Sequence, residues 1–276
     1  MIGWGYKDAI QVQNPGPLKL NHQVLLTLNT QALISLGRLQ ATGADLRFSK
    51  DCNGLSQYSY YIESGINTTA TKIWVLTDSL AANSNRVITM FYGNSTAPAG
   101  SSFDNTFPPS SRLIVSAGTI TLNGTNNFSW FEIALGATVL VGPNSPFVIN
   151  ARRIIIAGIL DGNGSGHLGG ASISNGSGPG GGFASTGNAG TFGAGGASYA
   201  GIGGPGGYPP PASNAPLTGQ PGLTYENAST DSINMGSGGG GSTVVGGAGG
   251  GGITLTGDFV NITGTIRANG AAGTNS

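Results

Sequence analysis

The stretch GGGGSTVVGGAGGGGITL, residues 238–255, joins a run of glycines directly to an alternating apolar segment. Glycine loses more backbone entropy on folding than any other residue and offers no side chain to pack. A flexible linker and a dinucleotide-binding loop are two explanations of such a run. The surrounding sequence favours a third, in which hydrogen-bonded glycine backbones form a scaffold inserted into a stack of β-strands.

The stretch closes a glycine-rich insertion at about residues 161–252. Unstructured loops of this length are uncommon inside compact domains, and a plain Gly/Ser linker is simpler in composition. The strict three-residue glycine period of collagen is absent. The composition resembles polyglycine-II regions of phage adhesins and of glycine-rich extracellular domains, with an ordered irregular loop and disorder as the alternatives. Its aromatic residues, which we expect to pin it to a surface, are Phe183, Phe192, Tyr199, Tyr208 and Tyr225.

Short strands flanked by glycine recur on both sides of the insertion. Gly118, Gly136 and Gly158 are spaced by about 20 residues. This pattern predicts a β-solenoid, in which each turn of the chain, or rung, buries its apolar face only against neighbouring rungs. A second small β-sandwich is the alternative. The repeated segments are AGTITLNG (117–124), GATVLVG (136–142), AGILDGNG (157–164) and TGTIRANG (263–270).

The correspondence between rungs continues across the insertion. Gly264 corresponds to Gly158, and Asn269 corresponds to Asn163. We therefore expect the segment ITLTGDFVNITGTI (253–266) to pair with FVINARRIIIAGIL (147–160), about a hundred residues earlier.

The first part of the chain, from about residue 4 to residue 107, has a different pattern. Segments such as AIQVQ, QVLLTLN, KIWVLT and RVITMFYG alternate apolar and polar residues and are separated by turn signals. This is typical of antiparallel strands with one buried face, and it predicts a β-sandwich. The segment TQALISLGRLQ, at 30–40, is the one short helix that the pattern predicts.

Several separated motifs in this part also resemble a known family. They are, in order, GWGYKDAIQVQN, NHQVLLTLNT, ADLRFSKDCNG, YYIES, TKIWVL, ITMFYGN and SSFDNTF. Together they resemble the family called domain of unknown function 2341. The resemblance implies a lectin-like β-sandwich at 1–109 and an extracellular or surface-exposed architecture, and it carries over no catalytic residue. The remainder, 110–276, is the solenoid-like domain, so the whole chain is expected to be all-β.

Composition excludes several classes of protein. Of the 276 residues, 51 are glycine, only 8% are charged, and the formal net charge is zero. A nucleic-acid partner needs a concentrated basic face, so none is expected. No run reaches the roughly 18 apolar residues of a membrane helix. The start MIGWGYKDAIQV lacks the pattern of a signal peptide, which fits assembly into a virus particle or a leader that was removed.

Motifs for catalysis, cofactors or metals do not assemble into a site. The segment GSGHLG (164–169) fits a dinucleotide fingerprint, but the glycines that follow it cannot form the required helix. His22 and His167 are expected to be lone exposed histidines, and Cys52 a turn thiol. Asp161 beside Asn163 lacks the regular repeat of a calcium solenoid. We therefore expect no catalytic residue, no cofactor and no metal.

Two further sets of residues carry expectations about surfaces. Exposed members of the aromatic set would stack on sugar rings, with burial in a sandwich core as the alternative; they are Trp4, Tyr58, Tyr60 and Trp74. N-glycosylation sequons permit modification and include Asn67, Asn94, Asn123 and Asn261. Asp45 and Arg47, two residues apart on one expected strand, share a face and predict an ion pair.

The combined expectation is a non-enzymatic structural or adhesive protein at a virion surface: a spike, fibre or tail component that attaches to host glycans. A secreted prokaryotic cell-surface or filament subunit is the alternative, and a glycan-processing enzyme is a weaker one. An uncapped stack of rungs leaves unpaired backbone groups, so itself or other subunits are the expected partners.

Overall fold

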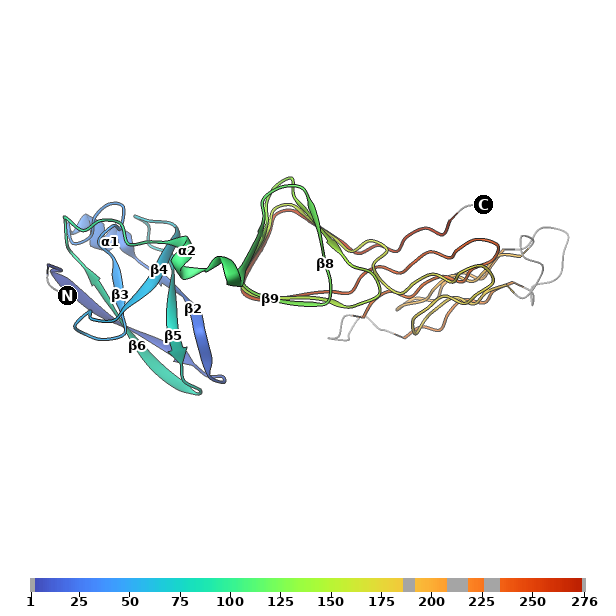
Figure 1. Ribbon diagram of the computed structural model, residues 1–276, viewed down its shortest axis with the longest axis horizontal. Coiled ribbons are helices and arrows are strands. Elements are labelled where there is room, and N and C mark those ends of the chain that lie inside the picture. The colour runs from blue at the N-terminus through green and yellow to red at the C-terminus, as the bar shows by residue number, and fades with distance from the viewer. Residues whose placement is uncertain (1–2, 186–191, 208–217, 226–233, 275–276) are drawn as a thin grey trace. The chain divides into compact units, whose positions relative to one another are not determined.

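The computed structural model describes residues 3–185, 192–207, 218–225 and 234–274. It is mostly β-strand with few short helices, so the chain is all-β (Figure 1). The chain divides into two compact units, Met1–Arg112 and Leu113–Ser276, which we describe separately. In the part of the chain that is described, no helix is long and apolar enough to span a membrane.

The first unit is built on one six-stranded sheet in the order β1-β6-β3-β4-β5-β2. Every registered pairing between neighbouring strands is antiparallel, as the period-2 alternation predicts. The strands are β1 (Tyr6–Asn14), β2 (Lys19–Leu28), β3 (Arg47–Ser49), β4 (Gln57–Ser64), β5 (Thr71–Leu80) and β6 (Ser84–Tyr92).

The sheet curls around a single apolar core. Side chains of both edge strands, such as Ile10 of β1 and Val24 of β2, pack against the same buried cluster. Phe48, Ile73 and Ile88 at its centre have no exposed surface. Hydrogen bonds therefore make one continuous sheet, and the curl brings its two edges to one core.

Two short helices accompany this sheet. The predicted helix is present as α1 (Thr30–Ser35), and the Asn29 side chain caps it by accepting a bond from the Ala32 N–H at 3.0 Å. A second helix, α2 (Phe103–Thr106), follows the Ser102 cap and was not predicted. It is continued by a 3-10 turn at Pro109–Ser111.

In the second unit the chain alternates between two four-stranded sheets. Each rung gives one strand to each sheet, and the registered pairings in both sheets are parallel. One sheet has the order β13-β11-β9-β7 and the other β14-β12-β10-β8. The bounds are β7 (Arg112–Val115), β8 (Thr119–Leu122), β9 (Thr125–Ile133), β10 (Thr138–Val141), β11 (Phe147–Ile156), β12 (Ile159–Asp161), β13 (Ile253–Ile262) and β14 (Thr265–Arg267).

The pairing expected across the insertion is confirmed. Phe147 lies opposite Ile253 in the parallel pair of β11 and β13, and Ile159 lies opposite Thr265 in the pair of β12 and β14. The Asn163 side chain also accepts a bond from the Asn269 N–H at 2.8 Å. The rungs thus continue in register as though the insertion were not there.

Inward side chains of successive rungs form the core of this unit. Phe131, Val139, Ile149, Ile154 and Leu160 are completely buried in one cluster. Each CH₂ group that is buried between these stacked strands stabilises the fold by about 0.8 kcal/mol. The core is therefore held chiefly by apolar side chains.

The glycine-rich segments are held by backbone hydrogen bonds instead (Figure 1, yellow to orange). Gly236 and Gly239 donate to the carbonyls of Gly250 and Gly247, at 2.9 Å each. Gly193 and Gly196 donate in the same antiparallel manner to Gly207 and Gly204 at 2.7 and 2.8 Å. Such bonds recur at every third residue, the repeat of an extended threefold helix, whereas a β-strand repeats at every second residue.

One segment also has more neighbours than a β-strand can have. The segment 236–241 exchanges backbone bonds with 167–170, 174–177, 182, 195 and 247–250. The bonds of a β-strand lie in one plane and reach two neighbours at most. The described glycine-rich segments between Gly162 and Gly252 therefore form a three-dimensional bundle rather than a sheet, and we call it the glycine bundle.

Close approach between the backbones explains the composition. A Cβ on Gly249 would overlap the carbonyl oxygen of Gly236, and one on Gly238 would overlap that of Leu168. Residues on the outside of the bundle are free of this restriction, since a Cβ on Gly204 would meet nothing within 4 Å.

Candidate functional site

Three of the four aromatic residues expected at a glycan surface are buried. Trp74 has no exposed surface, Tyr60 is 2% exposed and Tyr58 is 8% exposed. Tyr60 meets Phe48 edge to face at 5.1 Å inside the curled sheet, and its hydroxyl donates to the Leu46 carbonyl at 2.7 Å. These rings are therefore core residues, the alternative that the sequence left open.

Trp74 is covered on the other face of the sheet. Its ring packs edge to face on Phe107 at 5.5 Å, and its indole N–H donates to Glu63 Oε2 at 2.6 Å. Phe107 belongs to the segment around α2, which contacts β4 and β5. That segment buries a face that simple alternation assigns to solvent.

The buried tyrosines are held in the neutral form. Burial raises the pKa of Tyr58 to about 12, and the neighbouring Asp78 acts in the same direction, against Arg86. Burial also raises the pKa of Tyr60, although Arg47 opposes it. Neither hydroxyl is suited to act as a base at neutral pH.

Trp4 is half-buried beside the start of β1. Its indole N–H donates to the Asp45 carbonyl at 2.9 Å, and the Arg47 guanidinium lies over its ring at 5.5 Å. The expected ion pair between Asp45 and Arg47 is wrong. Asp45 precedes β3, and its carboxylate accepts the N–H groups of Gln40, Gly93 and Asn94 instead.

The start of β1 separates two surface hollows. A hollow of about 550 Å³ is lined by Gly5, Tyr6, Gly37, Arg38, Leu39, Gln40, Asp45, Gly93 and Ser95. A smaller one of about 290 Å³ is lined by Trp4, Gly5, Tyr6, Lys7, Cys52, Asn53 and Phe91. Gly5 and Tyr6 line both, so the two hollows flank one strand and form the candidate site of the first unit.

Tyr6 and Arg38 are the functional candidates that the sequence did not flag. Tyr6 is 42% exposed as a residue, and its ring stacks on Tyr92 at 5.4 Å, with the Arg38 guanidinium 5.0 Å from the ring centre. Gly93 makes room for this ring, because a Cβ there would lie 2.6 Å from Tyr6 Cδ2. Tyr6 could have been suspected from the sequence, because it lies two residues after Trp4. No feature of the sequence marks Arg38 as a site residue.

Cys52 is exposed in a turn that Asp51 organises. The Asp51 carboxylate accepts N–H bonds from Asn53, Leu55 and Ser56, and these bonds, that of Leu55 foremost, lower its pKa from 3.8 to about 2. The thiol contacts Asn53 Oδ1 at 3.8 Å. The geometry is that of a structural turn.

The two histidines lie in different units. His22 is 6% exposed, so its expected exposure is wrong, and its carbonyl accepts the Thr77 hydroxyl at 2.9 Å. His167 is half-buried in the glycine bundle, and its N–H donates to the Gly236 carbonyl at 2.9 Å.

The remaining motifs take part in turns and backbone bonds. Asp161 Oδ1 accepts the Asn163 N–H at 2.9 Å, and Asp161 Oδ2 lies 3.8 Å from Arg267. Gly166, inside the GSGHLG motif, donates to Gly249 at 2.8 Å. Among the residues with described positions, no three His, Cys, Asp or Glu side chains gather as metal ligands would.

The sequons differ in accessibility. Asn67, Asn123 and Asn261 are exposed. Asn94 is half-buried, and its side chain accepts bonds from the N–H and hydroxyl of Thr96 at 3.1 and 3.0 Å. Because a glycan attaches at Nδ2, the partial burial of Asn94, rather than these bonds to its Oδ1, limits access to this sequon.

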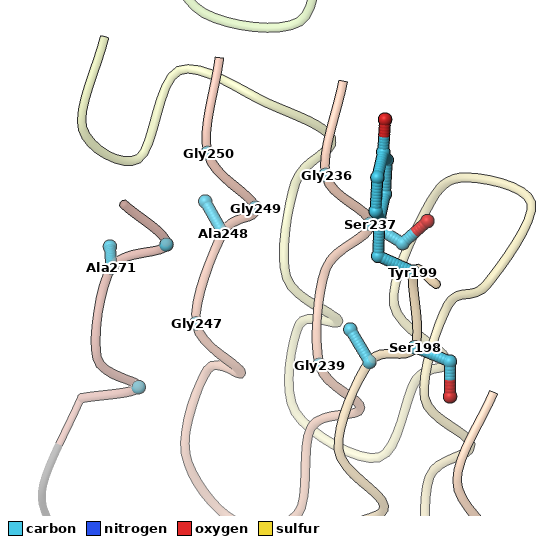
Figure 2. Close-up of a pocket in the computed structure, with 13 residues that line it drawn as sticks. Ser198, Tyr199, Gly236, Ser237, Gly239, Gly247, Ala248, Gly249, Gly250 and Ala271 are labelled. Carbon is cyan, nitrogen blue, oxygen red and sulfur yellow. The ribbon is translucent and has the colours of Figure 1, made fainter. Parts of the chain in front are cut away.

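The second unit has a groove of about 400 Å³ in the glycine bundle. Figure 2 shows it between extended segments through Gly236, Gly249 and Ala271. Ser237 Oγ, on its wall, accepts the Gly180 N–H at 3.0 Å. The groove thus presents backbone amides and small side chains. The aromatic residue that lines it is Tyr199, which packs on Tyr225 at 5.1 Å; Tyr208 lies outside the described residues.

Comparison with protein families bears on the first unit. Residues 42–109 match a domain of unknown function, DUF2341. The match confirms the family resemblance for these residues, while Trp4, Tyr6 and Arg38 precede it. No curated protein and no solved structure matches the chain.

Proposed function

We propose that this chain is a non-enzymatic structural and adhesive surface protein, most simply a spike, fibre or tail component of a virion. The observation that carries the proposal is the threefold hydrogen-bond pattern of the glycine segments. We interpret these segments as a polyglycine-II lattice and the two parallel sheets as a β-solenoid. Both devices build rigid length from short repeats and serve display rather than turnover.

The first unit is the adhesive part in this proposal. We interpret its curled sheet as a lectin-like sandwich of the DUF2341 type, with the hollows beside Tyr6 as its contact with host glycans. A concave hollow with polar groups beside a partly exposed aromatic residue has the features of a small-molecule site, and tyrosine offers both apolar and polar surface to a sugar.

The open ends of the parallel sheets support assembly with another subunit. Val260, Ile262 and Ile266 are 40%, 46% and 38% exposed, whereas their in-register neighbours Ile154, Ile156 and Leu160 are completely buried. Strands β13 and β14 are the last strands of their sheets. Exposed strand edges of this kind template pairing with another chain, so we propose a homo-oligomer or polymer, or a contact with another virion subunit.

The alternative is a secreted prokaryotic cell-surface or filament subunit, which the DUF2341 match favours. Immunogold electron microscopy of the source culture, with antibodies against the purified chain, separates the two. Label on virus particles supports the first proposal, and label on cell surfaces or filaments supports the alternative. Label confined to the cell interior would contradict both.

A further inference from the structure

We infer that the hollow beside Tyr6 and Arg38 binds a saccharide that carries a carboxylate group. The inference rests on the proposed adhesive function and names the ligand class of its site. The hollow, at about 550 Å³, lies within the range of about 300–1,000 Å³ that ligand pockets occupy.

The cation of the site is Arg38. Its guanidinium lies 5.0 Å from the centre of the Tyr6 ring. Within the described residues, no hydrogen bond or ion pair occupies its side chain. Stacking on a ring uses the flat face of a guanidinium and leaves the N–H groups at its edge free.

The nearby carboxylates are already engaged. Asp45 is 1% exposed, and its two oxygens accept three backbone N–H groups. Asp8 accepts the Tyr92 hydroxyl at 2.8 Å. Of the two charged residues that line the hollow, Arg38 is therefore the one with unused hydrogen-bond capacity, and a planar carboxylate is the group that its fork binds with two bonds.

The ring pair beneath Arg38 holds it in place. Tyr6 is fixed by stacking on Tyr92 and by the space that Gly93 leaves for it. Because the Tyr6 ring already stacks on Tyr92 and lies under Arg38, its exposed edge is the apolar surface that it offers to a sugar, and Ser95 adds a hydroxyl to the wall. Ring, cation and polar wall together fit an acidic sugar residue better than a neutral sugar or a simple anion.

The test measures binding of glucuronate, glucose and acetate to the full chain by NMR titration. We expect glucuronate to bind at least about tenfold more tightly than either control, because charge-assisted bonds are stronger than neutral ones. Arg38→Gln should lose about tenfold or more of glucuronate affinity, and Arg38→Lys should lose less. Arg86→Gln, at an arginine that also lies near a tyrosine ring but is paired with Asp78, is the matched control and should bind as the wild type does.

Equal affinity for glucose and glucuronate, or unchanged binding by Arg38→Gln with an unaltered circular dichroism spectrum, would overturn the inference. Acetate binding as tightly as glucuronate would overturn its saccharide part. Adhesion is measured separately, as attachment of the labelled chain to host or neighbouring cells. Glucuronate binding without attachment would refute the proposed function and leave the site standing, whereas attachment that Arg38→Gln leaves intact would refute only the role of this site in attachment.

Discussion

The rungs and the glycine bundle of the second unit are stabilised in opposite ways. In the rungs, buried side chains such as Ile154 and Val139 fill the space between parallel strands. In the bundle, the backbones themselves are in contact, and peptide groups bond to neighbours in several directions. The first arrangement tolerates exchange of one apolar side chain for another, while the second excludes any side chain at positions such as Gly249, where a Cβ would overlap a carbonyl oxygen.

The largest expected effect follows from this difference. Gly249→Ala should destabilise the second unit by more than about 4 kcal/mol, the range of exceptional substitutions, because its Cβ would overlap the Gly236 carbonyl oxygen. Gly204→Ala, at an exposed position with open space, is the control and should change stability by about 1 kcal/mol or less. Denaturant titration gives both values.

Amide hydrogen exchange checks the same contrast without mutation. We expect slow exchange at Gly236 and Gly239, whose N–H groups are bonded. Exchange as fast as in an unfolded chain at these positions, or equal stability of the two alanine variants, would show that the glycines act only as a tether.

A smaller effect is expected in the rungs. Ile154→Ala should cost about 2–5 kcal/mol, since it leaves a cavity in a closed core. Val260→Ala, at the in-register position of the last described rung, should cost less in the dissociated chain because Val260 is 40% exposed. Thermal unfolding at low protein concentration measures both.

A charged substitution at Val260 tests assembly. If another subunit covers β13, Val260→Asp should shift sedimentation towards the monomer while leaving the monomer folded. A wild-type chain that sediments as a compact monomer at high concentration would refute the assembly.

The smallest effect concerns acid. Bonding to Lys50 foremost lowers the pKa of Asp78 from 3.8 to about 2, and backbone bonds do the same for Asp51. A carboxyl group whose pKa is lowered by folding stabilises the protein above its unfolded pKa and loses this contribution as the pH falls towards its folded pKa. The first unit should therefore lose stability between about pH 4 and pH 2, with the exposed Asp78 pairs contributing about 0.2–1 kcal/mol.

The glycine bundle provides the internal comparison for this titration. Its described residues contain no carboxylate side chain, so its NMR signals should keep their dispersion over the same pH range. Asp78→Asn should reduce the acid response of the first unit. An equal loss in the bundle, or an unchanged response of the variant, would contradict the assignment.

Much of the fold was predictable because its signals are local. Alternation marked the strands, and the correspondence of Gly158 with Gly264 marked the pairing across the insertion. The curl of the first sheet was not predictable, since it depends on which distant strands pair. The sequence also does not predict which glycine segments hydrogen-bond to one another, because glycine has no side chain whose type would indicate its neighbour.

The candidate site was predictable only in part. Trp4 was named from its type and does lie beside a hollow. Tyr60 and Trp74 were named for the same reason but are buried, because alternation does not say that a later segment, around Phe107, covers the second face. Arg38 reaches Tyr6 from a loop, and no local pattern links two such distant positions.

The two ends of the insertion meet, and this has a consequence for how the chain can change. Gly251 donates its N–H to the Gly162 carbonyl at 2.8 Å, so the insertion begins and ends at adjoining positions of the rungs. Material between such adjoining ends can change in length without moving the two ends apart, although the insertion also bonds to the chain that follows it, through the Ala271 N–H and the Ala248 carbonyl at 2.8 Å. We therefore expect a change in the length of the glycine bundle to disturb the rungs less than an insertion whose two ends lie far apart.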